Sequence, residues 1–421
     1  MIGWKLKTRG LQPIGLDIGH NSIKMIQLAT NGEHMSILAA DKVRVDASIN
    51  GDGEERRSFV ISAIKQILAK GKFRGRNVVS CLPNDKLKIT SLRLAETEPD
   101  EMERALRKEA GQRFGLDPDR DTINYLIAGN VQSGEISKNE LILFAASDET
   151  IRSHIAMLEE VQLRPVVIDT VPHALFRSFE RSRRREEDRE RTDVFVDVGS
   201  QFTTVVFGRG GEISFTKQIP IGGEKFNSEI ASKLGVSIDE AEILREKLQM
   251  ESAIKAGIGL GVPKSSSPGQ GRAVPILQAE QNGNGHSAER FDRPERLTVE
   301  GLSRSPLDAS TQEVMVDAIG AAAEELAREI SLCLRYYTVT FRGKRVERAV
   351  FSGGEAYERI LLNVLRRHLT VEIEIAQPLK GLDMTNVNFD SDRRGLLCEW
   401  AVAVGLGLKG WDKDCKNYEG N

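Results

Sequence analysis

Apolar and polar positions alternate along the chain in a pattern that predicts paired strands joined by short turns. In two places a run of apolar, strand-forming residues, over 14–18 and over 194–198, ends in the same Asp-x-Gly pattern. A second strand pattern follows each turn, over 23–28 and over 203–207, and a glycine-containing turn comes after it. The sequence therefore predicts the same opening meander of strand, turn and strand twice.

The Asp-x-Gly turn has a chemistry that suits phosphate. A buried strand that delivers Asp17 or Asp197 and then turns on glycine brings a carboxylate and free backbone N–H groups to one place, which suits hydrated Mg²⁺ and phosphate oxygens. One such turn alone is common turn chemistry. Two of them in one chain indicate a nucleotide that is held from both sides.

A third element strengthens this prediction. Residues 348–356 combine a buried strand, a Gly-Gly turn at Gly353 and Gly354, and the start of a helix. Backbone N–H groups at a helix start can receive an anion or the ribose edge of a nucleotide. Together the three elements favour nucleotide binding.

Between the two meanders the pattern predicts a separate α/β insert. Two strands over 78–93 are split at Pro83, a helix covers 99–114, strands cover 122–130 and 140–146, and a second helix covers 149–161. The pattern G-x-G-x-x-G at 405–410 has too little chain after it to build a dinucleotide-binding unit. We interpret it as the close-packed end of a helix that runs from Arg394.

Composition limits the classes of protein. The chain has 421 residues, 40% of them hydrophobic, so it can bury substantial cores, and its length suggests two or three domains. Its formal charge of -3 gives no global field that favours nucleic acid. Its apolar runs are far shorter than a membrane span, and we expect no signal peptide and a soluble, cytoplasmic protein. The four cysteines lack metal-site spacing.

Two segments differ from the rest in composition. Residues 181–192 carry ten charges in twelve positions, which predicts a solvated linker or a frayed helix end. In residues 251–310, Gly, Pro and Ser supply 21 of 60 positions and Phe291 is the only aromatic residue. Because so little apolar surface cannot offset the cost of ordering, we predict a mobile insertion there.

These motifs, in this order, resemble the actin, Hsp70 and sugar-kinase superfamily. Within it the chain is similar to the PilM family, the FtsA-related actin-like proteins of type IV pilus assembly, over about nine tenths of its length. Further similarity lies in residues 78–83, 101–110, 223–227, 374–378 and 400–406.

The resemblance implies an α/β fold of the actin-like ATPase type, with two RNase H-like lobes and an inserted subdomain 1C. We expect subdomain 1A at 12–77, 162–180 and 385–410, and subdomain 1C, which handles protein partners, at 78–161. The linker would cover 181–192. Subdomain 2A would cover 193–224 and 313–384, and subdomain 2B would cover 225–312 with the insertion at about 251–310.

The motifs and the resemblance together give expected roles to single residues. Asp17 and Asp197 would hold Mg²⁺ mainly through water. The expected phosphate-binding residues are Gly19, His20, Asn21, Ser22, Lys24, Gly199, Ser200, Gln201 and Thr203. Those expected beside ribose and adenine are Gly222, Gly223, Glu242, Lys247, Gly353, Gly354 and Glu355. Glu224 is the one weak candidate for a catalytic base, and its simpler interpretation is a surface carboxylate.

One residue departs from the superfamily pattern. His20 stands where a hydroxyl or another small residue is usual beside the γ-phosphate. We therefore expect ATP to bind with slow or absent hydrolysis and to act as a conformational ligand. The resemblance implies that the partner is the cytoplasmic N-terminus of a PilN-like inner-membrane protein, bound between subdomains 1A and 1C, which would bring the chain to the inner face of the membrane. Self-association is left open.

Three alternatives stay open at this point. A small-molecule kinase of the sugar-kinase branch would need an acidic base, and the sequence offers none that is firm. An FtsA-like, filament-forming cell-division ATPase would end in an amphipathic anchor, whereas residues 411–421 are polar. A type II secretion protein of the GspL kind would continue into a membrane span.

Overall fold

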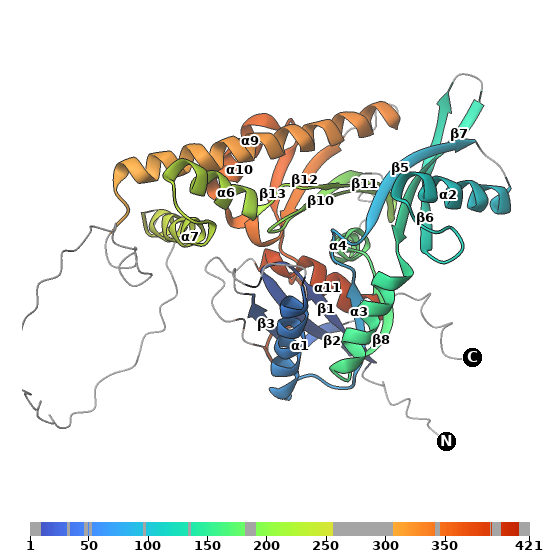
Figure 1. The fold of residues 1–421 in the computed structure, drawn as a ribbon, viewed down its shortest axis with the longest axis horizontal. Coiled ribbons are helices and arrows are strands. Elements are labelled where there is room, and N and C mark those ends of the chain that lie inside the picture. The colour runs from blue at the N-terminus through green and yellow to red at the C-terminus, as the bar shows by residue number, and fades with distance from the viewer. Residues whose placement is uncertain are drawn as a thin grey trace, which may run out of the picture.

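The computed structural model describes residues 10–31, 34–45, 49, 53–95, 98–133, 136–181, 191–255, 306–341, 346–387, 389 and 397–411. Within these residues the chain forms three β-sheets with helices packed on them (Figure 1). Among the described helices, none is long and apolar enough to cross a membrane.

The first sheet contains five strands in the order β3-β2-β1-β4-β8. The strands are β1 (Gly10–Ile18), β2 (Ser22–Asn31), β3 (His34–Arg44), β4 (Asn77–Cys81) and β8 (Arg164–Asp169). The first three are antiparallel neighbours, whereas β4 and β8 run parallel to β1. Apolar side chains at Ile14 and Leu16 are fully buried, as expected of a central strand covered on both faces.

The second sheet repeats this arrangement in the order β11-β10-β9-β12-β13. Its strands are β9 (Thr192–Val198), β10 (Thr203–Arg209), β11 (Glu212–Ile219), β12 (Val346–Ser352) and β13 (Glu372–Ile375). Here too the first three strands are antiparallel and the last two parallel. The two predicted meanders are therefore the corresponding strands of two sheets with one topology.

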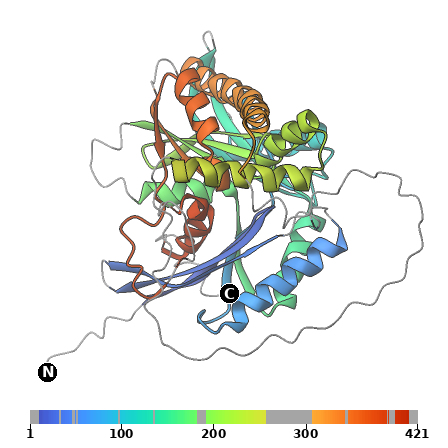
Figure 2. The same cartoon turned by 90° about the vertical axis from the view of Figure 1, so that its left-hand side faces the viewer.

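Helices cover both faces of each sheet. On the outer face of the first sheet lie α1 (Glu54–Ala69) and α3 (Asp148–Glu160), whose buried residues form one cluster with β1 and β2. On the outer face of the second sheet lie α6 (Gly223–Leu234), α9 (Ala309–Thr340) and α10 (Arg359–His368), with α7 (Ile238–Lys255) beside α6. Figure 2 shows the first sheet between α1 and the C-terminal helix.

Two helices fill the space between the sheets (Figure 1). They are α4 (Val171–Glu180) and α11 (Ala401–Gly407), and α11 is flanked by the short 3-10 turns η3 (Cys398–Trp400) and η4 (Lys409–Trp411). Phe179 of α4 stacks on Phe195 of β9 at a ring-centroid distance of 5.1 Å, while α11 packs on β1 and β2. These helices set the distance between the two sheets.

The third sheet has the order β5-β7-β6, with β5 (Lys88–Ala95), β6 (Thr122–Ser133) and β7 (Ile136–Ala146). One face packs on α2 (Pro99–Phe114), which ends at Gly115 in the left-handed region with φ 67°. The other face contributes Ile142 and Phe144 to the core of the second sheet. The insert is thus joined to the first lobe by the chain and to the second by packing.

The expected boundaries of the insert, 78–161, are wider than this third sheet. Residues 78–81 belong to β4 and pair with β1 and β8 in the first sheet. Helix α3 packs on the first sheet through Met157 and Leu158, and at its start the Asp148 N–H donates to Asp121 before β6. The two strands predicted over 78–93 therefore lie in different sheets: β4 has a parallel neighbour on each side in the first sheet, and β5 is an edge strand of the third sheet.

Other expected boundaries also change. The insertion predicted at 251–310 overlaps α7 at one end and α9 at the other, and residues 256–305 lie outside the described part of the chain, as does most of the charged linker at 181–192. The C-terminal α-helix begins at Ala401 rather than near Arg394. Its glycines permit close approach: a Cβ on Gly405 would lie 1.8 Å from the backbone oxygen of Ala174 in α4.

This close approach leads to the first prediction. Gly405→Ala should lower the free energy of unfolding by about 1–3 kcal/mol, because the added methyl group meets rigid backbone and the two central helices must separate. Gly320→Ala in α9 is the matched control: a Cβ there meets no atom within 4 Å, so higher helix propensity should stabilise the chain by up to about 1 kcal/mol. Urea unfolding measures both. Equal effects of the two substitutions would contradict this packing.

Candidate functional site

A cleft of about 530 Å³ lies between the two sheets. Both Asp-x-Gly turns line it, together with residues 83–85, helix α7 and the turn η2 (Gly354–Tyr357) that follows β12. The parallel topology of each sheet places the ends of β1 and β9 at this common edge.

The two turns have the same geometry. In the first, the backbone N–H of Gly19 donates to the carbonyl of Ser22 at 3.0 Å, and in the second Gly199 donates to Phe202 at 3.0 Å. A Cβ on either glycine would lie 3.0 Å from that same carbonyl. The predicted duplication is thus also a duplication of backbone conformation.

The carboxylates of the two turns have different partners. Asp17 is buried, and its Oδ2 lies 3.1 Å from the Nζ of Lys24, its cross-strand partner on β2. Asp197 accepts a hydrogen bond of 2.9 Å from the Oγ of Ser352 on β12. Lys24 corresponds in register to Thr204, the partner of Asp197 on β10, so the second turn has no equivalent lysine.

This asymmetry shifts the proton affinities. The pKa of Asp197 is raised to about 6, mainly by burial and further by the charge of Asp17, while the hydrogen bond from Ser352 and the charge of Lys24 oppose the shift. Burial alone would lower the pKa of Lys24, but the carboxylates of Asp17, Glu399 and Asp197 raise it. The floor of the cleft therefore holds more negative charge than Lys24 compensates, which favours a cation.

Each turn is supported from outside the cleft. Arg56 of α1 donates to the carbonyls of Gly19 and His20 at 2.9 and 3.1 Å. In the second lobe, the N-terminus of α6 provides the support: Gly223 donates to the carbonyl of Gly199 at 3.1 Å, and Glu224 donates to that of Ser200 at 2.8 Å. Both turns are therefore fixed before any ligand binds.

A buried ion pair closes one wall. Arg245 of α7 makes two hydrogen bonds with Glu355, at 2.9 and 3.0 Å, and lies over the ring of Phe226 at 5.5 Å from its centroid. Gly353 precedes Glu355 with φ 95°, and a Cβ there would lie 2.3 Å from the carbonyl of Val198. Only glycine lets the end of β12 approach β9 this closely.

Polar contacts also cross the cleft. Arg44 of β3 reaches Glu242 and Glu246 of α7 at 2.6 and 2.5 Å. Glu399 pairs with Lys42 at 3.2 Å and accepts a hydrogen bond of 2.7 Å from the hydroxyl of Tyr357. Because Arg44 is mostly exposed, its ion pairs hold the lobes only weakly together.

Most of the predicted site residues line this cleft. They are Asp17, Gly19, His20, Asn21, Ser22, Lys24, Asp197, Gly199, Ser200, Gln201, Glu242, Gly353, Gly354 and Glu355. The Oδ1 of Asn21 is buried and has no hydrogen-bond partner among the described residues. Since a carboxamide can turn over, this side chain can present either an acceptor or a donor to a ligand.

Five predicted residues are not among those that line the cleft: Thr203, Gly222, Gly223, Glu224 and Lys247. The hydroxyl of Thr203 instead donates to the carbonyl of Ile221 at 2.7 Å. The two glycines serve packing, since a Cβ on Gly222 would lie 2.4 Å from the carbonyl of Gly199 and one on Gly223 would meet the Glu355 carboxylate.

Sequence reasoning missed several cleft residues. Arg245 could have been found, because it lies three positions after Glu242 and so on the same face of the helix. Arg44, Arg56 and Glu399 carry no local signal, since each depends on an element distant in sequence. Only the folded chain brings them to the turns.

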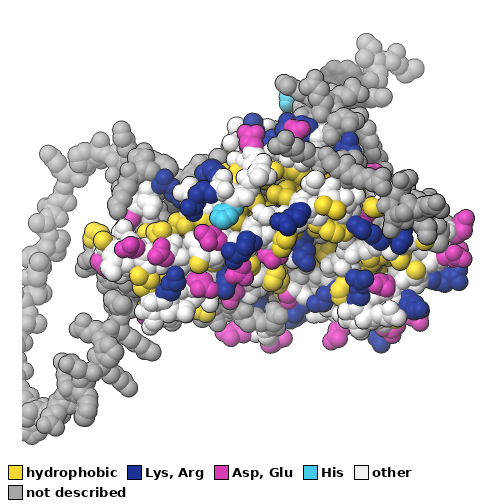
Figure 3. Space-filling view, turned by 90° about the horizontal axis from the view of Figure 1, so that it is seen from above, with side chains coloured by type: hydrophobic (Ala, Val, Ile, Leu, Met, Phe, Trp, Pro, Cys, Tyr) yellow, Lys and Arg dark blue, Asp and Glu magenta, His cyan; other side chains and the backbone are white. Residues whose placement is uncertain are grey.

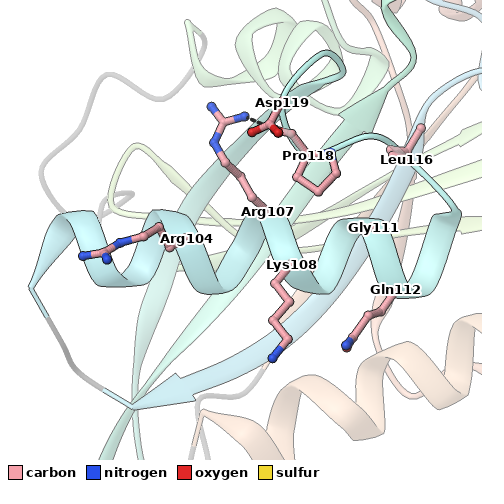
Figure 4. A pocket seen from close by; sticks show the side chains of 8 residues that line it. All are labelled: Arg104, Arg107, Lys108, Gly111, Gln112, Leu116, Pro118 and Asp119. Carbon is pink, nitrogen blue, oxygen red and sulfur yellow. Dashed lines mark hydrogen bonds between the residues drawn. The ribbon is translucent and has the colours of Figure 1, made fainter.

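A second pocket lies on the outer side of the insert, against α2 and the loop that follows it (Figure 4). It is lined by Arg104, Arg107, Lys108, Gly111, Gln112, Leu116, Pro118 and Asp119. Arg107 is already engaged with Glu103 and with the carbonyl of Pro118. This pocket is wide open and lacks the paired turns of the interlobe cleft, so we consider the cleft to be the functional site.

Two lobes with one sheet topology and a shared cleft at the ends of their first strands define the actin-like fold. Residues 15–258 match the family described as type IV pilus assembly protein PilM, which is more than half of the chain. The chain belongs to this PilM family.

A solved structure shares the fold over nearly the whole chain. The PilM-PilN type IV pilus biogenesis complex superposes with a TM-score of 0.65 at 20% identity, covering 95% of this chain and 98% of that chain. More distant likenesses include the ethanolamine utilization protein EutJ from Carboxydothermus hydrogenoformans, with a TM-score of 0.49 at 12% identity, covering 95% and 89%. MreB5 of Spiroplasma citri bound to ADP gives 0.44 at 11% identity, covering 98% and 99%.

The raised pKa of Asp197 leads to the second prediction. Because the folded-state pKa lies above the unfolded value, ionisation of Asp197 opposes folding, and this cost develops as pH rises from about 4 to about 6. Asp197→Asn should therefore stabilise the chain more at pH 7.5 than at pH 4.5, by on the order of 2 kcal/mol. Urea unfolding of both proteins at the two pH values measures the difference. A difference that does not change with pH would contradict the raised pKa.

Proposed function

We propose that the chain binds ATP with Mg²⁺ in the interlobe cleft and uses it as a conformational ligand during type IV pilus assembly. The observation that carries the proposal is the pair of turns with one geometry, closed by Gly19 and Gly199, on opposite sides of a single cleft. A ligand that contacts both turns stabilises the closed arrangement of the lobes by its higher affinity for that arrangement.

The donors in the cleft fit Mg²⁺ and phosphate. Asp17 and Asp197 would hold the metal mainly through water, because Mg²⁺ keeps several waters and takes few direct carboxylates. The metal would supply the positive charge that Lys24 alone does not provide. The phosphate-binding group would be formed by the two turns with His20, Asn21, Ser22, Lys24, Ser200 and Gln201.

The second lobe would hold the nucleoside. Gly353, Gly354 and Glu242 lie on the cleft surface next to the Arg245–Glu355 pair, where backbone can approach a ribose and a base. Glu224, the weak candidate for a catalytic base, donates its backbone N–H to the carbonyl of Ser200 in the second turn and is not among the residues that line the cleft. With His20 in place of a hydroxyl, we expect hydrolysis to be slow or absent.

The inserted sheet would carry the partner site. We assign it the role of subdomain 1C, and we propose that the N-terminal segment of a PilN-like inner-membrane protein binds between it and the first lobe. The PilM-PilN type IV pilus biogenesis complex, whose fold this chain shares, supports the choice of partner. Binding there would place a cytoplasmic chain at the inner face of the membrane.

The insert also contacts the second lobe, so a movement of that lobe can reach it. Arg93 of β5 donates to Glu140 of β7 at 2.7 Å, and Glu140 accepts a hydrogen bond of 2.5 Å from Tyr336 of α9. Since β5 and β7 belong to the insert and α9 to the second lobe, a movement of that lobe would be transmitted to the partner groove. ATP and the partner should therefore influence each other's affinity.

The third prediction tests the nucleotide. Calorimetric titration of the full chain should detect binding of Mg·ATP, and Asp17→Asn or Asp197→Asn should weaken it at least about tenfold. Asp85→Asn, which removes a carboxylate from the lip of the same cleft, should change it less than about twofold. Equal losses for all three variants, or no binding by the unaltered chain, would refute the proposed site.

The fourth prediction tests the partner. A fluorescent peptide with the N-terminal sequence of the PilN-like protein of the same pilus system should bind the full chain, and saturating Mg·ATP should tighten this binding by about 5-fold or more. The fluorescence anisotropy of the peptide measures both affinities. Peptide binding without any effect of ATP would exclude the conformational role, and absence of binding would exclude the partner.

A further inference from the structure

Helix α9 presents an unusually long surface to solvent. It has 32 residues, a length of about 48 Å, and lies along the top of the second lobe in Figure 1. Its inner face is buried from Met315 to Thr340 against the second sheet, α6 and α10. Figure 3 looks onto the side of the molecule on which α9 lies, where acidic, basic and hydrophobic side chains are mixed.

Seven residues form one straight line along the outer face of this helix. They follow each other at spacings of three or four positions, which keeps them on one side of the helix. They are Asp317, Ala321, Glu324, Arg328, Leu332, Arg335 and Val339, and we call this line the α9 stripe. Leu332 is 49% exposed and Val339 is 74% exposed. The C-terminal half of the line thus presents two large apolar side chains to solvent.

The charges of the α9 stripe are divided by sign. Asp317 and Glu324 lie in its N-terminal half, and Arg328 and Arg335 lie in its C-terminal half. Within the described residues, none of these four side chains makes an ion pair or a side-chain hydrogen bond. The stripe therefore carries charges of both signs that have no partner among the described residues of the folded chain.

We propose that the α9 stripe is an interface with a second copy of this chain, in which two α9 helices pack antiparallel about a two-fold axis. In this arrangement Asp317 of one copy faces Arg335 of the other, and Glu324 faces Arg328. The small Ala321 faces Leu332, so the exposed leucine enters a space that the alanine leaves. Every contact occurs twice, as a two-fold interface requires.

The charges of the α9 stripe determine the relative orientation of the two helices. A parallel pair would bring Asp317 next to Asp317 and Arg335 next to Arg335, and such like charges repel. The antiparallel pair matches opposite charges along the whole stripe. One pair of helices buries less surface than the roughly 1,600 Å² of a standard interface, so we expect a weak dimer with a Kd on the order of 10 µM.

The fifth prediction tests this interface by charge exchange. Sedimentation velocity of the full chain between roughly 1 and 200 µM should show a reversible monomer–dimer equilibrium. Asp317→Arg alone and Arg335→Asp alone should each weaken the dimer at least about tenfold, because each substitution places like charges at two contacts. The double variant D317R/R335D exchanges the charges and should restore dimerisation.

A matched control separates the interface from a general effect of charge. Arg366→Asp makes the same change on the exposed last turn of α10, outside the α9 stripe, and should leave the equilibrium unchanged. All substituted side chains are exposed, so the melting temperature of each variant should remain close to that of the original chain. The proposal would be overturned if the unaltered chain stays monomeric over the whole concentration range. It would also be overturned if neither single charge reversal weakens the dimer, or if the double variant does not dimerise again.

Discussion

The floor of the interlobe cleft contains two carboxylates and one compensating lysine, and this imbalance governs the rest of the site. Asp17 and Asp197 approach from equivalent strands of two equivalent sheets, but only Asp17 has Lys24 beside it. The pKa of Asp197 is consequently raised to about 6, mainly by burial and further by the charge of Asp17. An arrangement that is costly without a cation and favourable with one is typical of a binding site whose closed state depends on its ligand.

Close packing of the backbone holds the two carboxylates and the lysine in their positions. Gly405 lets α4 and α11 touch between the sheets, and Gly353 lets β12 turn against β9 at the rim of the cleft. The third sheet connects the two lobes in a way that the two duplicated sheets alone would not. It belongs to the first lobe by chain order, yet Phe144 lies in the core of the second lobe. A movement of one lobe relative to the other would therefore also move the inserted sheet.

The sequence predicted the features that depend on local patterns. The apolar runs and the Asp-x-Gly turns predicted the duplicated meander, and the apolar spacing of α2 predicted the helix Pro99–Phe114. Both predictions were possible because the periodicity of a strand or helix depends on residues that are close in sequence. It did not reveal that residues 78–81 leave the insert for the first sheet, since parallel pairing joins distant segments. For the same reason Arg44, Arg56 and Glu399 were missed, and the buried hydroxyl of Thr203 was assigned to a ligand although it serves the backbone.

A metal held between the two turns is the central feature of the proposed site. The most direct measurement is a crystal structure of the chain with Mn²⁺ in place of Mg²⁺ and a non-hydrolysable ATP analogue, in which anomalous scattering locates the metal. We predict a single strong peak between the carboxylates of Asp17 and Asp197, within reach of both through one layer of water. Nucleotide bound in the cleft with the metal elsewhere, or nucleotide bound outside the cleft, would contradict it.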